Sequence, residues 1–255
     1  MMSDDLFKIE RTGRVACCIM SNPERMNALG PEMGIPLIEN INQLIEDDKV
    51  GVIIIRGEGG NFCSGSDIDL LGENLDPSFL RNAMITMNEL LYRLHEGSKP
   101  VITEVDGYAF GGGLGLALSS DITYATERAK FCIGFIRIGA VMDLGTSFFL
   151  LERIGMAKAK ELAFTGDIMN SEEACRIGLI NRVVHHDNIS EEVMKLAQRI
   201  SEKSADALLW TKRSLNRARH MDLKAMLDFE AHIQPLMLLS DEHKKVMKNF
   251  FWKNR

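Results

Sequence analysis

The chain has 255 residues and a mass of 28.6 kDa, a length that favours one large domain with a docked tail. Lys and Arg number 30 against 36 Asp and Glu, and the resulting net charge of −6 excludes a broadly basic surface for nucleic acid or anionic membranes. With 45% hydrophobic and 26% charged residues, the composition is that of a globular protein and not of a disordered, collagen-like or membrane protein.

The first 14 residues carry acidic side chains and no long apolar run, so they do not resemble a signal or transit peptide. No stretch approaches the ~20 apolar residues of a membrane span. The five cysteines are an odd number and include no C-x-x-C pair. We therefore expect a cytoplasmic protein with reduced cysteines in its core or in a pocket.

Buried apolar runs alternate with helical patterns through the first half of the chain. The expected strands are residues 6–10, 15–20, 50–56, 101–105, 122–125 and 131–138. The expected helices are residues 31–47, 76–95 and 114–119. This alternation predicts a mainly parallel sheet with helical crossovers.

From residue 144 onward the pattern is almost entirely helical. The expected helices are residues 144–153, 157–164, 171–176, 190–202, 204–219, 222–238 and 241–252, with a short strand at 180–184. We predict an α/β core over residues 1–190 and a helical region over 191–255. Apolar side chains in 236–239 and 246–252 exceed the needs of an exposed final helix, which predicts that a partner subunit covers them.

Two glycine-containing loops follow consecutive buried strands, at residues 63–67 (C-S-G-S-D) and 111–113 (G-G-G). The glycines in each loop leave the backbone uncovered by side chains where a helix could begin. Free N–H groups at such a place can bind an anion. Two loops that each aim one N–H at a single oxygen would form an oxyanion hole. The alternative is that these glycines serve only tight turns and close packing.

Other common motifs are absent. A dinucleotide-binding G-x-G-x-x-G from Gly111 fails because position 116 is Leu116, and no phosphate-binding loop occurs. Neither Ser64 nor Ser66 lies in a G-x-S-x-G elbow. We interpret the adjacent His185 and His186 as a solvated turn, so the sequence predicts no metal site.

Several motifs, in order along nearly the whole chain, resemble the crotonase, or enoyl-CoA hydratase/isomerase, superfamily. Residues 22–29 resemble N-P-x-x-x-N-A-L, 61–67 resemble F-C-A-G-A-D, 106–121 resemble N-G-x-A-x-G-G-G-x…D, 142–147 resemble P-D-x-G-(T/G)-S, and 162–181 resemble L-x-x-T-G…E-A…G-L-V-N. The resemblance implies a spiral of ββα turns with a C-terminal helical trimerisation region. It also implies a homotrimer or a dimer of trimers that processes acyl-CoA thioesters in fatty acid metabolism.

The resemblance further implies roles for individual residues. The N–H groups of Ser66 and Gly112 would bind the thioester oxygen, with Asp143 as the acid–base group. No cofactor is expected, because coenzyme A is part of the substrate. The remaining expected substrate-binding residues are Arg25, Met26, Ala28, Ser64, Asp67, Ile68, Gly111, Phe135 and Leu144.

The chain departs from the family's hydratases at both catalytic glutamates, whose positions here are Gly115 and Phe135. Addition of water by two carboxylates is therefore hard to support. Asp143 remains, either as a helix N-cap or as a general base with a pKa raised by apolar neighbours. A single carboxylate suits a 1,3-proton shift, so double-bond isomerisation is the preferred activity.

Four alternatives or additions stay open from the sequence. The chain could be a specialised hydratase-like lyase, or Asp143 could act as a nucleophile in an aromatic acyl-CoA hydrolase or dehalogenase. A non-catalytic acyl-CoA-binding protein would retain the oxyanion hole alone. Tyr92 or His95 could also face the pocket, although packing or surface roles are the simpler interpretation.

Overall fold

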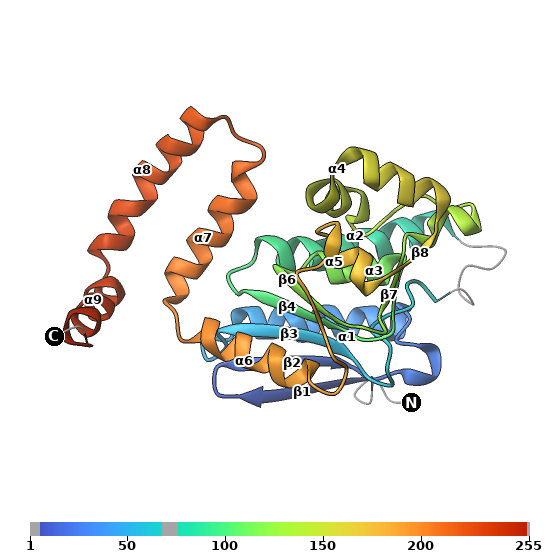
Figure 1. Ribbon diagram of the computed structural model, residues 1–255, viewed down its shortest axis with the longest axis horizontal. Coiled ribbons are helices and arrows are strands. Elements are labelled where there is room, and N and C mark those ends of the chain that lie inside the picture. The colour runs from blue at the N-terminus through green and yellow to red at the C-terminus, as the bar shows by residue number, and fades with distance from the viewer. Residues whose placement is uncertain (1–5, 68–75, 254–255) are drawn as a thin grey trace.

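The computed structural model describes residues 6–67 and 76–253. A six-stranded sheet has the order β1-β2-β3-β4-β6-β9, and a three-stranded sheet has the order β5-β7-β8 (Figure 1). The strands are β1 (Phe7–Thr12), β2 (Val15–Met20), β3 (Val52–Gly57), β4 (Val101–Val105), β5 (Tyr108–Phe110), β6 (Ile122–Thr126), β7 (Lys130–Cys132), β8 (Ile168–Asn170) and β9 (Arg182–Val184).

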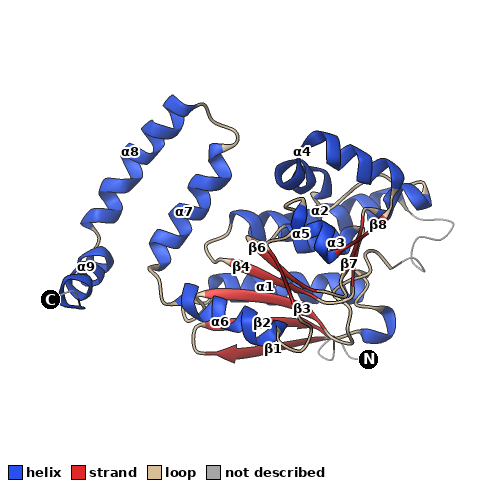
Figure 2. Cartoon of the chain, viewed as in Figure 1, coloured by secondary structure: helices blue, strands red, loops and turns tan. Residues whose placement is uncertain are grey.

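Helices cover both faces of the larger sheet and form the C-terminal part of the chain (Figure 2). The α-helices are α1 (Pro31–Glu46), α2 (Pro77–Glu96), α3 (Gly112–Leu118), α4 (Thr146–Thr165), α5 (Ser171–Arg176), α6 (Ile189–Ser201), α7 (Ala205–Ala218), α8 (Leu223–Leu239) and α9 (Asp241–Lys253). Two 3-10 helices used below are η2 (Pro23–Arg25) and η4 (Gly134–Ile138).

The larger sheet is parallel from β2 to β9, as the sequence predicts, and only the β1–β2 hairpin is antiparallel among its described pairs. Strand β2 shows why its sequence is continuously apolar. Val15 and Ile19 pack toward α6, whereas Ala16 and Met20 pack into the main core. A strand that is covered on both faces does not need to alternate polar and apolar residues.

The smaller sheet corrects the prediction of one strand over residues 131–138. Only Lys130–Cys132 is a strand, and the chain then turns into η4 at Gly134. The strands β5 and β8 were not expected at all, because each has three residues and too few side chains for a periodic signal. Strand β5 carries the chain directly into the glycines at 111–113.

The cysteine prediction is confirmed for the described chain, in which all five are free. Cys17, Cys18, Cys63 and Cys132 are buried. The two helices expected at 144–153 and 157–164 form one element, α4, whose kink is at Gly155 (φ 72°).

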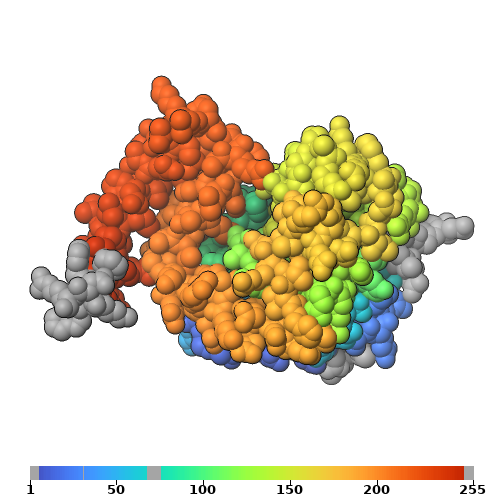
Figure 3. Space-filling view, viewed as in Figure 1, coloured from blue at the N-terminus to red at the C-terminus, as the bar shows by residue number. Residues whose placement is uncertain are grey.

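The C-terminal helices divide into one that packs on the sheet and three that extend from it. Ile189 and Val193 of α6 are buried against the larger sheet. Figure 3 shows α7 and α8, in orange to red, protruding from the rest of the molecule. Lys212 fastens α7 to the core, because its buried ammonium donates to Leu94 O and Lys99 O and pairs with Asp121.

Large apolar side chains remain exposed on the protruding helices. The exposed fraction reaches 76% for Leu223 and 71% for Leu239. The side chains of residues 250–252 lie outside the described part. Among the helices that the structure describes, none is both long and apolar enough to cross a membrane.

Candidate active site

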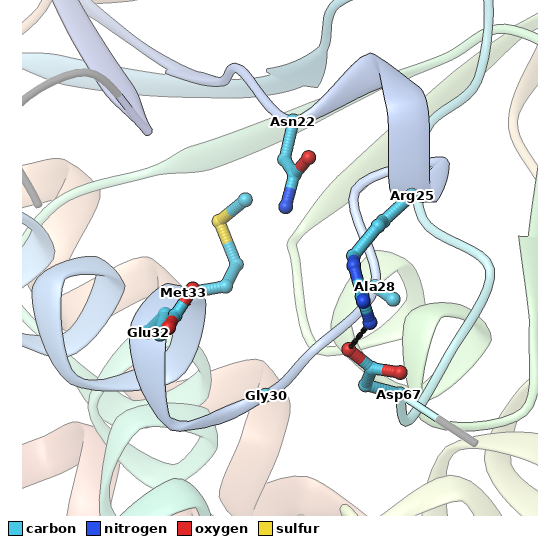
Figure 4. A pocket seen from close by; sticks show the side chains of 7 residues that line it. All are labelled: Asn22, Arg25, Ala28, Gly30, Glu32, Met33 and Asp67. Carbon is cyan, nitrogen blue, oxygen red and sulfur yellow. Dashed lines mark hydrogen bonds and ion pairs between the residues drawn. The ribbon is translucent and has the colours of Figure 1, made fainter. Parts of the chain in front are cut away.

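A cleft of about 320 Å³ lies between the turn around η2 and the start of α1 (Figure 4). Three residues that the sequence assigned to substrate binding line it together: Arg25, Ala28 and Asp67. Arg25 Nη1 lies 2.5 Å from Asp67 Oδ2, and this ion pair closes one side of the cleft. Sequence reasoning missed the other lining residues, which are Asn22, Gly30, Glu32 and Met33.

The wall of this cleft depends on Asn27, which the sequence analysis did not single out. Asn27 is fully buried and has a left-handed backbone (φ 54°), as does Met26 before it (φ 49°). Its side-chain nitrogen donates to Glu58 O (3.0 Å) and Asn61 O (2.8 Å). The sequence could have indicated a left-handed residue at position 27, because asparagine is among the few residues other than glycine that often adopt this conformation.

The loop at 63–67 is joined to the same turn by backbone hydrogen bonds. Ser64 N donates to Met26 O at 3.0 Å, and the Ser64 hydroxyl donates to Arg25 O at 3.4 Å. Leu29 N donates to Gly65 O, and Asp67 N donates to Leu29 O. Met26 is 41% exposed, and Ile68 lies outside the described residues.

Ser66 and Gly112 present the two N–H groups that the sequence assigned to an oxyanion hole. The parallel bridge between Leu29 and Ser66 uses the N–H groups of Leu29 and Asp67, so the Ser66 N–H points elsewhere. Gly112 is the first residue of α3, where an N–H has no intrahelical acceptor. Within the described ranges, neither N–H donates to a backbone or side-chain acceptor.

The two loops lie against each other. A Cβ placed on Gly65 would lie 2.8 Å from Phe110 O and 3.5 Å from Gly112 N. The absence of a side chain at Gly65, which has φ 98°, allows this approach. At Gly111 the backbone also has a positive φ, of 50°, and its N–H donates to Cys132 O in the smaller sheet. Strand β7 therefore helps to position the start of α3.

Asp143 lies beside the first turn of α3. A Cβ on Gly112 would be 3.8 Å from Asp143 Oδ1. This oxygen is buried and has no hydrogen-bond partner among the described residues. Burial raises the pKa of the Asp143 carboxyl above its usual value, and a hydrogen bond from its own backbone N–H opposes the shift. A partly buried carboxylate with a raised pKa is a better proton acceptor than a fully solvated one, which suits a general base.

The capping role considered for Asp143 is wrong. Helix α4 begins at Thr146, and its N-cap is Gly145, with φ 66° and no side-chain hydrogen bond. Asp143 contributes only its backbone oxygen, which accepts from Thr146 N at 2.9 Å. Leu144 also has a positive φ, of 47°, a conformation that costs a non-glycine residue ~1–3 kcal/mol. Leu144 packs under Gly112, where a Cβ would come within 2.8 Å of its Cδ1.

The two positions occupied by glutamate in the hydratase pattern are closed by packing. A Cβ on Gly115 would lie 2.7 Å from Thr146 Oγ1 and 2.8 Å from Leu144 O, so a longer side chain cannot enter without moving α4. Phe135 is 7% exposed, and its ring lies 3.8 Å from the Cβ position of Gly111. Neither position supplies a carboxylate beside Asp143.

Neither Tyr92 nor His95, which the sequence left open as pocket residues, lines the cleft beside η2. Tyr92 is 65% exposed. His95 packs edge-on against Phe148 and Phe149, and burial lowers the pKa of its imidazole. His95 and Lys212 both line a separate cleft of about 220 Å³ between the core and α7.

Comparison with known proteins gives a consistent result. The family model for enoyl-CoA hydratase/isomerase matches residues 10–255. The chain is 31% identical to a probable enoyl-CoA hydratase of Rhizobium meliloti over 100% of this chain and 98% of that protein. It is also 31% identical to the 1,2-epoxyphenylacetyl-CoA isomerase of Escherichia coli, over 99% of this chain and 97% of that one.

Solved structures extend the comparison to the fold. An enoyl-CoA hydratase from Polaromonas sp. JS666 superposes with a TM-score of 0.92 at 27% identity, covering 97% of each chain. One from Thermoplasma volcanium GSS1 gives 0.89 at 31% identity, covering 96% of this chain and 97% of the other. The predicted crotonase-like α/β fold is confirmed.

Proposed function

The chain belongs to the enoyl-CoA hydratase/isomerase family. We propose that this acyl-CoA-processing enzyme shifts the double bond of a 3-enoyl-CoA, which joins C3 and C4, to the position between C2 and C3. One observation carries the proposal: a single half-buried carboxylate, Asp143, lies beside Gly112, while Gly115 and Phe135 stand where a hydratase needs its two glutamates.

The substrate is held at two places. The cleft lined by Arg25, Ala28 and Asp67 receives the coenzyme A portion. The N–H groups of Ser66 and Gly112, free of other acceptors in the described chain, donate to the thioester oxygen. Loss of one such donor typically raises a barrier by about 3 kcal/mol, so this contact makes the weakly acidic α-proton accessible to a side-chain base.

Asp143 then carries one proton between two carbons. Its carboxylate removes a proton from C2 of the 3-enoyl thioester, and the electron pair enters a dienolate whose oxygen accepts from the two N–H groups. The protonated Asp143 returns the proton to C4, which leaves the double bond between C2 and C3. No water is consumed. A raised pKa suits both steps, because the same group must first accept and then donate.

Hydration is the second candidate, and the names of the relatives favour it. The matched proteins include a crotonyl-CoA hydratase of Syntrophomonas wolfei, 31% identical over 97% of this chain. Hydration would require Asp143 both to activate water and to deliver the proton, because positions 115 and 135 supply no carboxylate. The isomerase relative is named for an epoxyphenylacetyl thioester, so cyclic acyl groups belong among the substrates tested.

The two candidates are separated by product analysis. Purified protein is incubated with 3-enoyl-CoA and 2-enoyl-CoA of several chain lengths and with a cyclic acyl-CoA, and double-bond position and water addition are followed by mass spectrometry. The proposal predicts interconversion of the 2- and 3-enoyl thioesters without hydroxyacyl product. Net hydration of 2-enoyl-CoA would contradict it, and tight binding without turnover would indicate an acyl-CoA-binding protein.

The proposed assembly is a homotrimer or a dimer of trimers. Its support is the row of exposed apolar side chains on α8, where Leu236 is 61% and Leu239 is 71% exposed. Large exposed patches of this kind mark protein–protein contacts. Light scattering of the purified protein should give a mass three or six times that of the chain. A monomer would contradict this assembly.

A further inference from the structure

A cluster of metal-binding side chains lies outside the proposed active site. Glu127 directly follows β6, and His185 and His186 directly follow β9. The two strands are parallel neighbours, and Thr126 pairs with Val184. The fold therefore brings together groups that are 58 residues apart in the sequence, at the end of the sheet where both strands finish.

The ligand atoms converge. Glu127 Oε1 lies 2.6 Å from His186 Nδ1 and 3.7 Å from His185 Nε2. These three atoms all lie within 4.8 Å of one another. A first-row divalent ion holds nitrogen and oxygen ligands at about 2.0–2.2 Å, which separates neighbouring ligands by roughly 3–3.5 Å. Small rotations of partly exposed side chains reach that geometry.

Asp187 provides a second, independent observation. Its carboxylate faces the ring nitrogens that point away from Glu127: Oδ2 lies 3.6 Å from His185 Nδ1, and Oδ1 lies 3.3 Å from His186 Nε2. Histidines that bind metals usually donate their other N–H to a carboxylate, which fixes the tautomer and the ring orientation. The carboxylate beside the outer nitrogen of His186 matches that arrangement, whereas the outer nitrogen of His185 also accepts from the backbone N–H of Asp187 at 3.4 Å.

The backbone and local charge also favour a cation. His186 N donates to Glu127 Oε2 at 2.9 Å, which orients the carboxylate. The adjacent cation, Arg128, is turned toward Asp106, to which its Nε donates at 2.7 Å.

We propose that Glu127, His185 and His186 form a binding site for Zn²⁺ or a similar borderline divalent ion. Two imidazoles and one carboxylate suit Zn²⁺, whereas Mg²⁺ and Ca²⁺ prefer oxygen ligands alone. Binding displaces the proton shared by His186 and Glu127 to solvent, and water completes the coordination. The ion ties the β6–β7 turn to the segment that follows β9, and it takes no part in the proposed isomerisation.

Calorimetry tests the site on the full-length protein after treatment with a chelator. Titration with ZnCl₂ should show one saturable site of micromolar affinity, and CoCl₂ should give visible d–d absorption. Glu127→Gln and His186→Gln should each weaken Zn²⁺ binding more than tenfold. Asp187→Asn, which removes the outer carboxylate, should weaken it by about 10-fold or more. Zinc should raise the Tm of the wild-type protein and leave that of the variants unchanged.

Two controls separate this site from adventitious binding. His232 is an exposed histidine on α8 whose Nδ1 is paired with Asp228 O, and His232→Gln should leave the affinity unchanged. Cys175, the partly exposed thiol, is removed in Cys175→Ser, which should also bind normally. The proposal is overturned if no saturable binding occurs, if Glu127→Gln and His186→Gln bind as the wild type does, or if Cys175→Ser loses the ion.

Discussion

The two ends of the proposed active site differ in how their polar groups are satisfied. At the coenzyme A end, Arg25 pairs with Asp67, and Asn27 makes three hydrogen bonds from a buried side chain. At the acyl end, Asp143 Oδ1 is buried beside Gly112 and has no hydrogen-bond partner in the described chain. Paired groups fix the shape of a binding surface, whereas an unpaired carboxylate retains the proton affinity that chemistry requires.

The largest effect is expected from Asp143→Asn. General acid–base catalysis contributes about 10²–10⁴-fold, so kcat for isomerisation should fall by that factor while acyl-CoA still binds. Steady-state kinetics together with calorimetric titration of a non-reactive acyl-CoA measures both quantities. Arg25→Gln is the matched variant at the coenzyme A end. An equal fall in kcat for Arg25→Gln would show that the two ends of the site do not differ in their contribution to catalysis.

Gly115→Ala is expected to destabilise the fold. The added methyl meets the backbone oxygen of Leu144 at 2.8 Å, and overpacking of this kind typically costs about 1–3 kcal/mol. Urea denaturation measures the loss. Gly134→Ala serves as the control, because Gly134 likewise has no positive φ and an added methyl there meets only Cys132 Sγ, at an ordinary contact distance of 3.5 Å. An unchanged midpoint for Gly115→Ala would show that position 115 has room for a side chain.

The difference in stability between the wild type and Asp143→Asn should depend on pH in a defined direction. The folded protein raises the pKa of Asp143, so it holds the proton more tightly than the unfolded chain does. The stability of the wild type therefore falls as the pH rises from the unfolded value, ~3.9, through the raised folded value. The Asn variant should be the more stable protein above that window and equal to wild type below it. Thermal melts of both proteins from pH 3.5 to 8 measure the difference.

The smallest effect is expected from Arg25→Gln itself. It removes the ion pair with Asp67 from the rim of the cleft, where Arg25 is half exposed. Exposed pairs are worth only about 0–1 kcal/mol, so KM for acyl-CoA should rise a few-fold at most with kcat unchanged. Initial-rate kinetics measures the separation of the two constants. A fall in kcat without a change in KM would place Arg25 at the reacting end.

The order of the motifs was enough to predict the fold family, and three of the predicted binding residues, Arg25, Ala28 and Asp67, line one cleft. Residues 22–29 and 63–67 come after the parallel strands β2 and β3 of the larger sheet, whose carboxyl ends lie at one edge, and residues 111–113 follow β5 of the smaller sheet. The roles assigned to Ser66, Gly112 and Asp143 stay predictions, because an N–H or carboxylate position says what a group can do and not which thioester it meets.

What the sequence did not predict depended on contacts between distant segments. The strands β5 and β8 have three residues each and are specified by pairing with β7. The capping role of Asp143 failed because two successive left-handed residues, Leu144 and Gly145, delay the start of α4. Glu127 lies 58 residues from His185, and only the β6–β9 register shows that they meet.

The most direct test of the proposed mechanism is label exchange in heavy water. Wild-type protein and Asp143→Asn are incubated with 3-enoyl-CoA in D₂O, and deuterium at C2 and C4 is located by mass spectrometry as the double bond moves. In the wild type the mechanism predicts that the double bond moves and that the deuterium taken up lies at C2 and C4 alone, because Asp143 exchanges protons only with these two carbons; migration should be nearly abolished in the variant. Double-bond migration at the wild-type rate in Asp143→Asn would contradict it.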